Sequence, residues 1–132
     1  MVFGTKNSLH SQVGQDFLVQ SLLGCQENGF FLELAAFNPE RLSNSLMIER
    51  DFNWKGLCVE ANPNQWNAFA PRKCTLVGAA VGSPTDKVVT FTFKGSLSGI
   101  VDGNTDNHVE SKQGSKDLHI VALGDLLKKF NA

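Results

Sequence analysis

Two stretches decide the fold class of this chain: FFLELAA at residues 30–36 and GLCVEANP at residues 56–63. Each holds an apolar run that is continuous rather than alternating, which is typical of a parallel strand covered on both faces. A third apolar run, CTLVGAAV, follows at residues 74–81. Helix signals lie between these runs, so strands and helices alternate along the chain. The alternation predicts a doubly wound α/β sheet.

The predicted helices begin at polar capping residues. Ser43 or Asn44 precedes the apolar residues of a helix that runs to about residue 51, and Asn62 precedes a helix through residues 65–69. Side chains of these types accept hydrogen bonds from the first free backbone N–H groups of a helix. The two helices therefore connect the first strand to the second and the second to the third.

An earlier segment, SQVGQDFLVQSLLG at residues 11–24, has a helical period. Its residues Val13, Phe17, Leu18 and Leu22 fall near one face at a spacing of about 3.6 residues, and Gly24 is a stop signal. The pattern predicts an amphipathic helix.

The period changes after residue 82. Residues 88–93 alternate between apolar and polar positions, as in a half-exposed antiparallel strand. Residues 95–116 are rich in Gly, Ser, Asn and Asp and predict a long loop without an element of its own, and residues 119–122 predict a short strand before a helix that the end of the chain cuts off.

Length and composition indicate one domain. The chain has 132 residues, of which 42% are hydrophobic, and its 12 Lys and Arg against 13 Asp and Glu give a formal charge of −1. Such a balance supplies no positive field for nucleic acid or anionic membranes. No apolar run approaches the roughly 18–20 residues that a bilayer requires. Residues 1–12 lack the apolar run of a secretory signal.

Cysteine and histidine give no metal signal. The three cysteines, Cys25, Cys58 and Cys74, match no zinc spacing, and the three histidines are far apart. The cysteines are predicted to be buried thiols, which suit a reducing, cytoplasmic compartment, although a pair between Cys58 and Cys74 on neighbouring strands stays open.

Several polar residues map to the carboxyl ends of the predicted strands, where ligands of open α/β sheets bind. Glu60 ends the second strand, 27 residues after Glu33. An acid at that place either accepts both hydroxyl hydrogens of a ribose or is an ordinary solvated strand-end acid. Ser43 and Asn44 either cap their helix or bind a ligand.

Read together, five blocks resemble the N-terminal part of an FkbM-type methyltransferase domain, over about residues 11–127. The most specific block is NWKGLCVEANP at residues 53–63, because a Trp-Lys-Gly turn, an apolar strand, a terminal Glu and Asn-Pro occur in that order. The other blocks are SQVGQD at 11–16, FFLELAA at 30–36, SNSLMIE at 43–49 and the arginine-to-cysteine step at 72–74 that leads to AAV at 79–81.

The resemblance implies a Rossmann-like sheet of the class I methyltransferase type that binds S-adenosylmethionine and methylates a hydroxyl of a sugar or another small molecule. It places Glu33 near the methionine part of the cofactor and Glu60 at the adenosine ribose. It places Asn62 and Ala79 on the adenine side. Gln12 and Asp16 match positions that set the first helix over the cofactor mouth. The remaining cofactor-binding candidates that it implies are Ala35, Asn38, Ser43 and Asn44. It does not identify a catalytic residue.

The loop after the first strand departs from the family pattern. Ala35 and Pro39 occupy its two glycine positions, and Phe37 adds bulk between them. If those positions need positive φ or backbone contact with a ligand, cofactor binding is weakened. The alternative function is therefore a catalytically inactive methyltransferase-like binding or assembly module.

The chain also stops before the strand that, in the family, pairs with the first strand and supplies much of the substrate side. The resemblance therefore implies one partial domain over residues 1–132. Within it, residues 11–82 form a cofactor-binding βαβαβ half, and residues 83–132 form the antiparallel extension, the loop and the start of the next helix. We expect a fragment, a split domain completed by another chain, or a homodimer across the open edge of the first strand.

Overall fold

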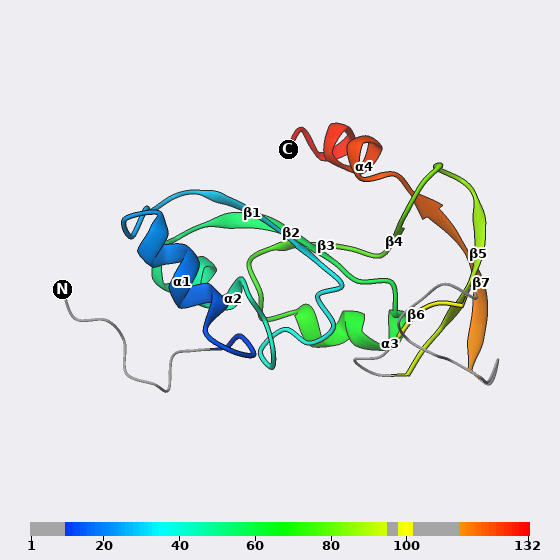
Figure 1. Cartoon of the computed structure of the whole chain (residues 1–132), viewed down its shortest axis with the longest axis horizontal. Coiled ribbons are helices and arrows are strands. Elements are labelled where there is room, and N and C mark those ends of the chain that lie inside the picture. The colour runs from blue at the N-terminus through cyan, green and yellow to red at the C-terminus, as the bar shows by residue number, and fades with distance from the viewer. Residues whose placement is uncertain (1–9, 95–97, 102–113) are drawn as a thin grey trace. The chain divides into compact units, whose positions relative to one another are not determined.

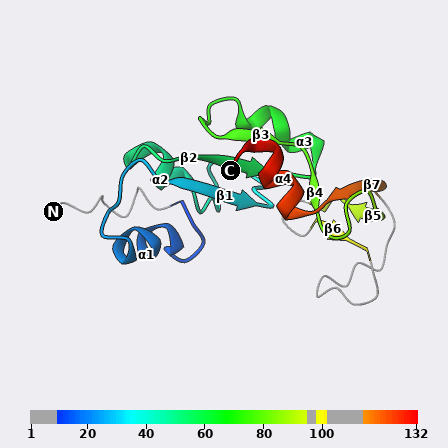
Figure 2. The same cartoon turned by 90° about the horizontal axis from the view of Figure 1, so that it is seen from above.

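The computed structural model describes residues 10–94, 98–101 and 114–132 (Figures 1 and 2). The chain divides into two compact units, Met1–Val77 and Gly78–Ala132. The single domain expected from the length is thus organised as two units, and each is described by itself.

The first unit is an α/β unit with a parallel three-stranded sheet in the order β1-β2-β3 (Figure 1). The three strands confirm the predicted alternation of strands and helices. The elements in chain order are α1 (Gln15–Leu22), β1 (Phe30–Leu34), α2 (Leu46–Asp51), β2 (Lys55–Val59), α3 (Pro63–Trp66), a 3-10 turn η2 (Asn67–Phe69) and β3 (Thr75–Val77).

The hydrophobic cluster of the first unit lies on the face of this sheet that carries Phe31 and Cys58. Phe31 and Cys58 point from β1 and β2 into a cluster with Met47 and Ile48 of α2. Phe31 faces Gly56 across the β1–β2 pair. A side chain at Gly56 would collide with the backbone oxygen and the ring of Phe31, so this position admits only glycine. Further members of the cluster are Ala36, Trp54 and Phe69.

The prediction that the first strand is covered on both faces is wrong. Phe30 is 50% exposed and Leu34 is 44% exposed, and both belong to the face of β1 opposite Phe31. Among the described residues, β1 is an edge strand, because β2 is its one neighbour in the sheet. The central strand β2 does match the prediction, since every residue from Gly56 to Val59 is buried.

Helix α1 is amphipathic, but its polar face is buried and its apolar face is exposed, the reverse of an ordinary surface helix. Its buried residues are the polar Asp16 and Gln20. Leu18 is 57% exposed and Leu22 is 76% exposed, and Val13 just before the helix is 85% exposed. The apolar stripe that predicted this helix is therefore its outer face. The helix is also shorter than residues 11–24, because residues 11–14 form bends that lead into it.

The predicted third strand is divided. Thr75–Val77 pairs with β2 in the first unit, whereas β4 (Ala80–Val81) pairs with a strand of the second unit. The break falls at Gly78 and Ala79, which belong to neither strand. One continuous apolar run therefore serves two sheets.

The second unit is a mixed four-stranded sheet in the order β4-β7-β5-β6. The antiparallel strand predicted from alternation is β5 (Val88–Thr92), which pairs with β7 (Ser115–Val121) and with β6 (Gly99–Ile100). The prediction of a loop without an element is wrong at β6 and at the start of β7. Residues 95–97 and 102–113 of that loop lie outside the described residues. Helix α4 (Leu123–Phe130) follows β7 as predicted and ends at Asn131, which is left-handed.

Candidate functional site

Glu60 lies directly after β2 and organises the turns around it. One carboxylate oxygen accepts the backbone N–H of Phe37 at 2.7 Å, and the other accepts the N–H of Asn62 at 2.6 Å. The side chain is 6% exposed. A carboxylate has about four acceptor positions, so each oxygen keeps capacity for one further donor. Glu60 is therefore a buried, pre-oriented acceptor rather than the solvated acid of the alternative interpretation.

The loop that follows β1 is tied to the end of β2. The N–H of Ala36 donates to the carbonyl of Val59 at 3.0 Å, next to the bond from Phe37 to Glu60. Ala35 has φ 53° and Phe37 has φ 48°, both in the left-handed region that glycine adopts most readily. Ala35 thus adopts a left-handed backbone conformation that is typical of glycine. The conformation brings the loop backbone against the Glu60 carboxylate.

Glu33 lies in a different environment, inside a shell of donors. Its carboxylate accepts the Ser43 hydroxyl at 3.1 Å, the Ser45 hydroxyl, and the Asn44 N–H at 2.8 Å. The structure therefore brings together three predicted residues, Glu33, Ser43 and Asn44. With three donors from the chain itself and 8% exposure, Glu33 fixes the start of α2.

The capping of α2 differs from the prediction. Ser45, not Ser43 or Asn44, is the residue that precedes the helix. The Ser43 hydroxyl nevertheless accepts the N–H of Leu46 at 3.1 Å and that of Ser45 at 3.4 Å, so it satisfies the free donors of the first turn.

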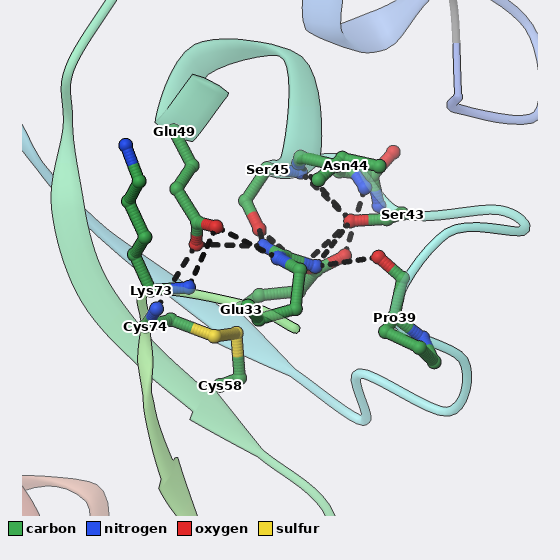
Figure 3. The surroundings of a disulfide bond; sticks show 11 residues. Glu33, Pro39, Ser43, Asn44, Ser45, Glu49, Cys58, Lys73 and Cys74 are labelled. Atoms are coloured by element: carbon green, nitrogen blue, oxygen red, sulfur yellow. Dashed lines mark hydrogen bonds and ion pairs between the residues drawn. A yellow bond between two sulfur atoms is a disulfide. The ribbon is translucent and has the colours of Figure 1, made fainter. Parts of the chain in front are cut away.

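Sequence reasoning missed the ion pair at the centre of this cluster. Arg72 and Glu49 form a two-pronged pair in which both bonds measure 3.1 Å, and the side chains are 2% and 4% exposed. Arg72 also donates to the carbonyl of Pro39 at 2.7 Å and to the hydroxyls of Ser43 and Ser45 at 3.2 and 2.9 Å. We call these residues with Glu33 the buried polar network (Figure 3). Both charged residues fall in the quoted blocks, but no spacing pattern signals a pair 23 residues apart.

Glu49 also accepts backbone donors from the segment before β3. The N–H of Lys73 reaches one oxygen at 2.9 Å, and the N–H of Cys74 reaches the other at 3.1 Å. The network therefore connects β1, the loop after it, α2 and the entry to β3. Every N–H group of the Arg72 guanidinium donates a hydrogen bond within the network. We therefore infer that the network stabilises the fold of the first unit.

The other predicted site residues have local roles. Asn62 caps α3 as predicted, because its side chain accepts the Asn64 N–H at 3.0 Å. The Asn38 side chain accepts the N–H groups of Glu40 and Arg41 at 3.0 and 2.8 Å, which shapes the loop itself. Ala79 lies in the second unit, between β3 and β4.

Asp16 holds the segment that leads into α1. Its carboxylate accepts the Ser11 hydroxyl at 2.6 Å and the N–H groups of His10 and Phe17 at 3.1 and 2.9 Å. Burial raises the pKa of this carboxyl, but the hydrogen bonds from Ser11, His10 and Phe17 outweigh burial, so the pKa lies below 3.8. Gln12, its neighbour in the quoted block, is exposed.

The prediction of three thiols is wrong for two of the cysteines. Cys58 and Cys74 form a disulfide with a Cα–Cα distance of 6.0 Å. Cys58 is fully buried, and Cys25 is not part of the bond. The pairing that the sequence left open is thus the one formed. It also removes the ground for expecting a reducing compartment, because disulfides persist in oxidising ones.

The described part of the chain holds no group of three His, Cys, Asp or Glu side chains placed to bind a metal. None of the described helices is long and apolar enough to cross a bilayer. Comparisons of the chain with protein-family models, with curated proteins and with solved structures give no match.

Proposed function

We propose that this chain binds S-adenosylmethionine at the carboxyl ends of β1 and β2, as the cofactor half of a Rossmann-like, FkbM-like methyltransferase domain. Glu60 carries the proposal, because its two oxygens stand at the end of the middle strand with acceptor capacity left on each. A ribose offers two neighbouring hydroxyl donors, which such a carboxylate can take together.

The sheet order supports the same interpretation. Strands β1, β2 and β3 are parallel and adjacent in the order β1-β2-β3. Doubly wound nucleotide-binding sheets begin with this arrangement, in which the first strand is nearest the centre of the complete sheet. The exposed edge of β1 is then the place of the next strand, supplied by further chain or by a partner.

The residues present fit the nucleoside side of the cofactor better than its methionine side. Glu60 and Asn62 lie together after β2, and the loop backbone from Ala35 to Phe37 lies against Glu60. Glu33, by contrast, already accepts three donors of the chain. In this proposal Glu60 holds the ribose, and Glu33 acts indirectly by fixing the loop and α2.

When bound, S-adenosylmethionine supplies an activated methyl group to a nucleophile, here a hydroxyl of a sugar or another small molecule. Such transfer depends mainly on the alignment of the nucleophile with the methyl carbon. The contribution of this chain is to bind and orient the nucleoside through Glu60 and the loop. We assign no catalytic base among its residues.

A second candidate is a catalytically inactive binding or assembly module of the same ancestry. The observation that favours it is the outer face of α1, where Leu18 and Leu22 are 57% and 76% exposed. Apolar surface of this kind marks interaction sites in soluble proteins. In this second function the polar network only stabilises a scaffold.

Calorimetric titration with S-adenosylhomocysteine and with S-adenosylmethionine separates the two candidates. We expect saturable binding by the wild-type chain and a loss of at least about tenfold in affinity for Glu60→Gln, since one buried charge–hydroxyl contact is worth about 1.5–3 kcal/mol. Glu40→Gln is the matched control, because Glu40 is exposed in the loop after β1, whose Phe37 N–H donates to Glu60. Circular dichroism shows whether each variant is folded.

The fluorescence of Trp66 gives a second check on Glu60→Gln. The Trp66 indole donates to the Glu60 backbone oxygen at 2.9 Å. An emission spectrum unchanged from that of the wild-type chain, to which Trp54 also contributes, therefore indicates that the turn after β2 is intact. Absence of binding by the folded wild-type chain contradicts the cofactor proposal and favours the second candidate.

A further inference from the structure

The disulfide closes the chain segment that carries the proposed ligand-binding acid. Cys58 lies in β2 and Cys74 lies immediately before β3, with a sequence separation of 16 residues. Glu60 follows Cys58 by two positions, and Arg72 precedes Cys74 by two. One covalent bond therefore fixes both ends of the connection between β2 and β3. We call this connection, residues 59–73, the crossover segment.

The strand pairing at the far end of this segment is short. Strand β3 has three residues and pairs with β2 at three positions only. Cys74 stands outside that ladder, so the disulfide ties β2 to a point that the strand pairing does not reach. A short ladder opens more readily than a long one, because few bonds must break together. The disulfide therefore adds to the Arg72–Glu49 contacts in holding the segment closed.

The same bond positions one end of the buried polar network. The Cys74 N–H donates to Glu49 at 3.1 Å, beside the N–H of Lys73 at 2.9 Å. Figure 3 shows the disulfide and these donors around the Glu49 carboxylate. Arg72 extends the contact to the Pro39 carbonyl in the loop after β1. A movement of Cys74 therefore affects the loop after β1, which contacts Arg72 through Pro39 and Glu60 through Phe37.

We propose that the Cys58–Cys74 disulfide is a redox switch for the ligand site, an inference that rests on the proposed function of Glu60. The oxidised form holds the crossover segment, and with it Glu60, in the binding arrangement. In the reduced form the β2–β3 ladder and the Arg72–Glu49 contacts alone hold the segment, so it opens more often.

The reductant of this switch is a dithiol. Its thiolate attacks Sγ of Cys74, because Cys74 is partly exposed whereas Cys58 is fully buried. The S–S bond breaks, Cys58 leaves as a thiolate and takes up a proton, and a mixed disulfide remains on Cys74. The second thiol of the reductant then displaces Cys74. Two electrons and two protons pass to the protein, and the reductant becomes a disulfide.

Hydrogen exchange on the full chain, with and without dithiothreitol, tests the structural part. We expect amide exchange in the crossover segment to rise by at least about tenfold on reduction and to return on reoxidation, since closing a loop of about 15 residues is a substantial constraint. The β5–β7 ladder of the second unit is the internal control. Unchanged exchange in the segment overturns the proposal. An equal rise in exchange throughout the first unit also overturns it, because the disulfide then stabilises the whole unit and not the segment in particular.

Titration of both forms with S-adenosylhomocysteine tests the functional part. We expect the oxidised chain to bind at least about tenfold more tightly than the reduced chain, and the variant Cys58→Ala/Cys74→Ala to match the reduced chain under both conditions. Cys25→Ala is the control, because Cys25 is outside the disulfide. Equal affinity of both forms overturns the switch. Binding by neither form overturns the proposed function instead, and the exchange comparison then still decides whether the disulfide controls the segment.

Discussion

Replacement of Arg72 by leucine tests whether the buried polar network holds the first unit together. The change leaves the Glu49 carboxylate, 3% exposed, with only the N–H groups of Lys73 and Cys74 as donors. Removal of one partner from a buried ion pair costs about 3–5 kcal/mol. Small domains have about 5–15 kcal/mol of stability in total, so we expect Arg72→Leu to lose a large share of it.

Urea denaturation followed by tryptophan fluorescence measures this loss in the first unit alone. Both tryptophans of the chain, Trp54 and Trp66, belong to that unit. The matched control is Arg50→Leu, because the Arg50–Asp51 pair is exposed, with side chains 49% and 38% accessible. An exposed pair of this kind contributes about 0–1 kcal/mol.

Two further variants sharpen the result. Arg72→Lys keeps the charge but loses the fork that reaches both oxygens of Glu49, so we expect an intermediate loss. Arg72→Leu/Glu49→Leu removes both charges and should lose less than the sum of the two single changes. If Arg72→Leu costs no more than Arg50→Leu, the network does not support the fold and the reasoning is refuted.

Two other predictions concern single positions in the same unit. Ala35→Gly should stabilise it by about 0.5–1 kcal/mol in the same urea assay, because Ala35 has φ 53°; Ala36→Gly, at a buried neighbour without positive φ, should destabilise it instead. The pKa of Asp16 lies below 3.8, so its stabilising effect is complete above pH 3.8 and disappears as the pH falls through the folded-state pKa. The stability advantage of the wild-type chain over Asp16→Asn should therefore be present at pH 5 and shrink below pH 3.8, and an advantage that does not change with pH would contradict this assignment.

The alternation of strands and helices in the first unit could be predicted because local signals there agree with the tertiary structure. Apolar runs and the Asn62 cap point to the observed strands and to the helix between β2 and β3. The predicted Trp-Lys-Gly turn is wrong at its end, because Lys55 and Gly56 already belong to β2. The division of the third run was not predictable, since CTLVGAAV is apolar throughout and its two halves pair with different sheets. Which partner a strand finds is a property of the fold, not of its composition.

The candidate site was predictable only in part, for a similar reason. Glu33 and Glu60 lie near the carboxyl ends of β1 and β2, where ligands of open α/β sheets bind, so both could be predicted as site residues. Both are buried there. Glu49 and Arg72 depend on the approach of α2 to the segment before β3, which no spacing encodes. The disulfide likewise depends on the register of β2 and β3. Helix α1 shows the limit most clearly, because a period locates the two faces of a helix without stating which is buried.

The outward apolar face of α1 has a practical consequence for work with this chain in solution. Dyes that fluoresce on apolar surfaces are commonly used to recognise partly folded, molten states. Here Leu18 and Leu22 offer such a surface while the core of the first unit is intact. A dye signal from this protein is therefore compatible with the native fold. Proof of a molten state requires loss of the tryptophan signature of the first unit as well.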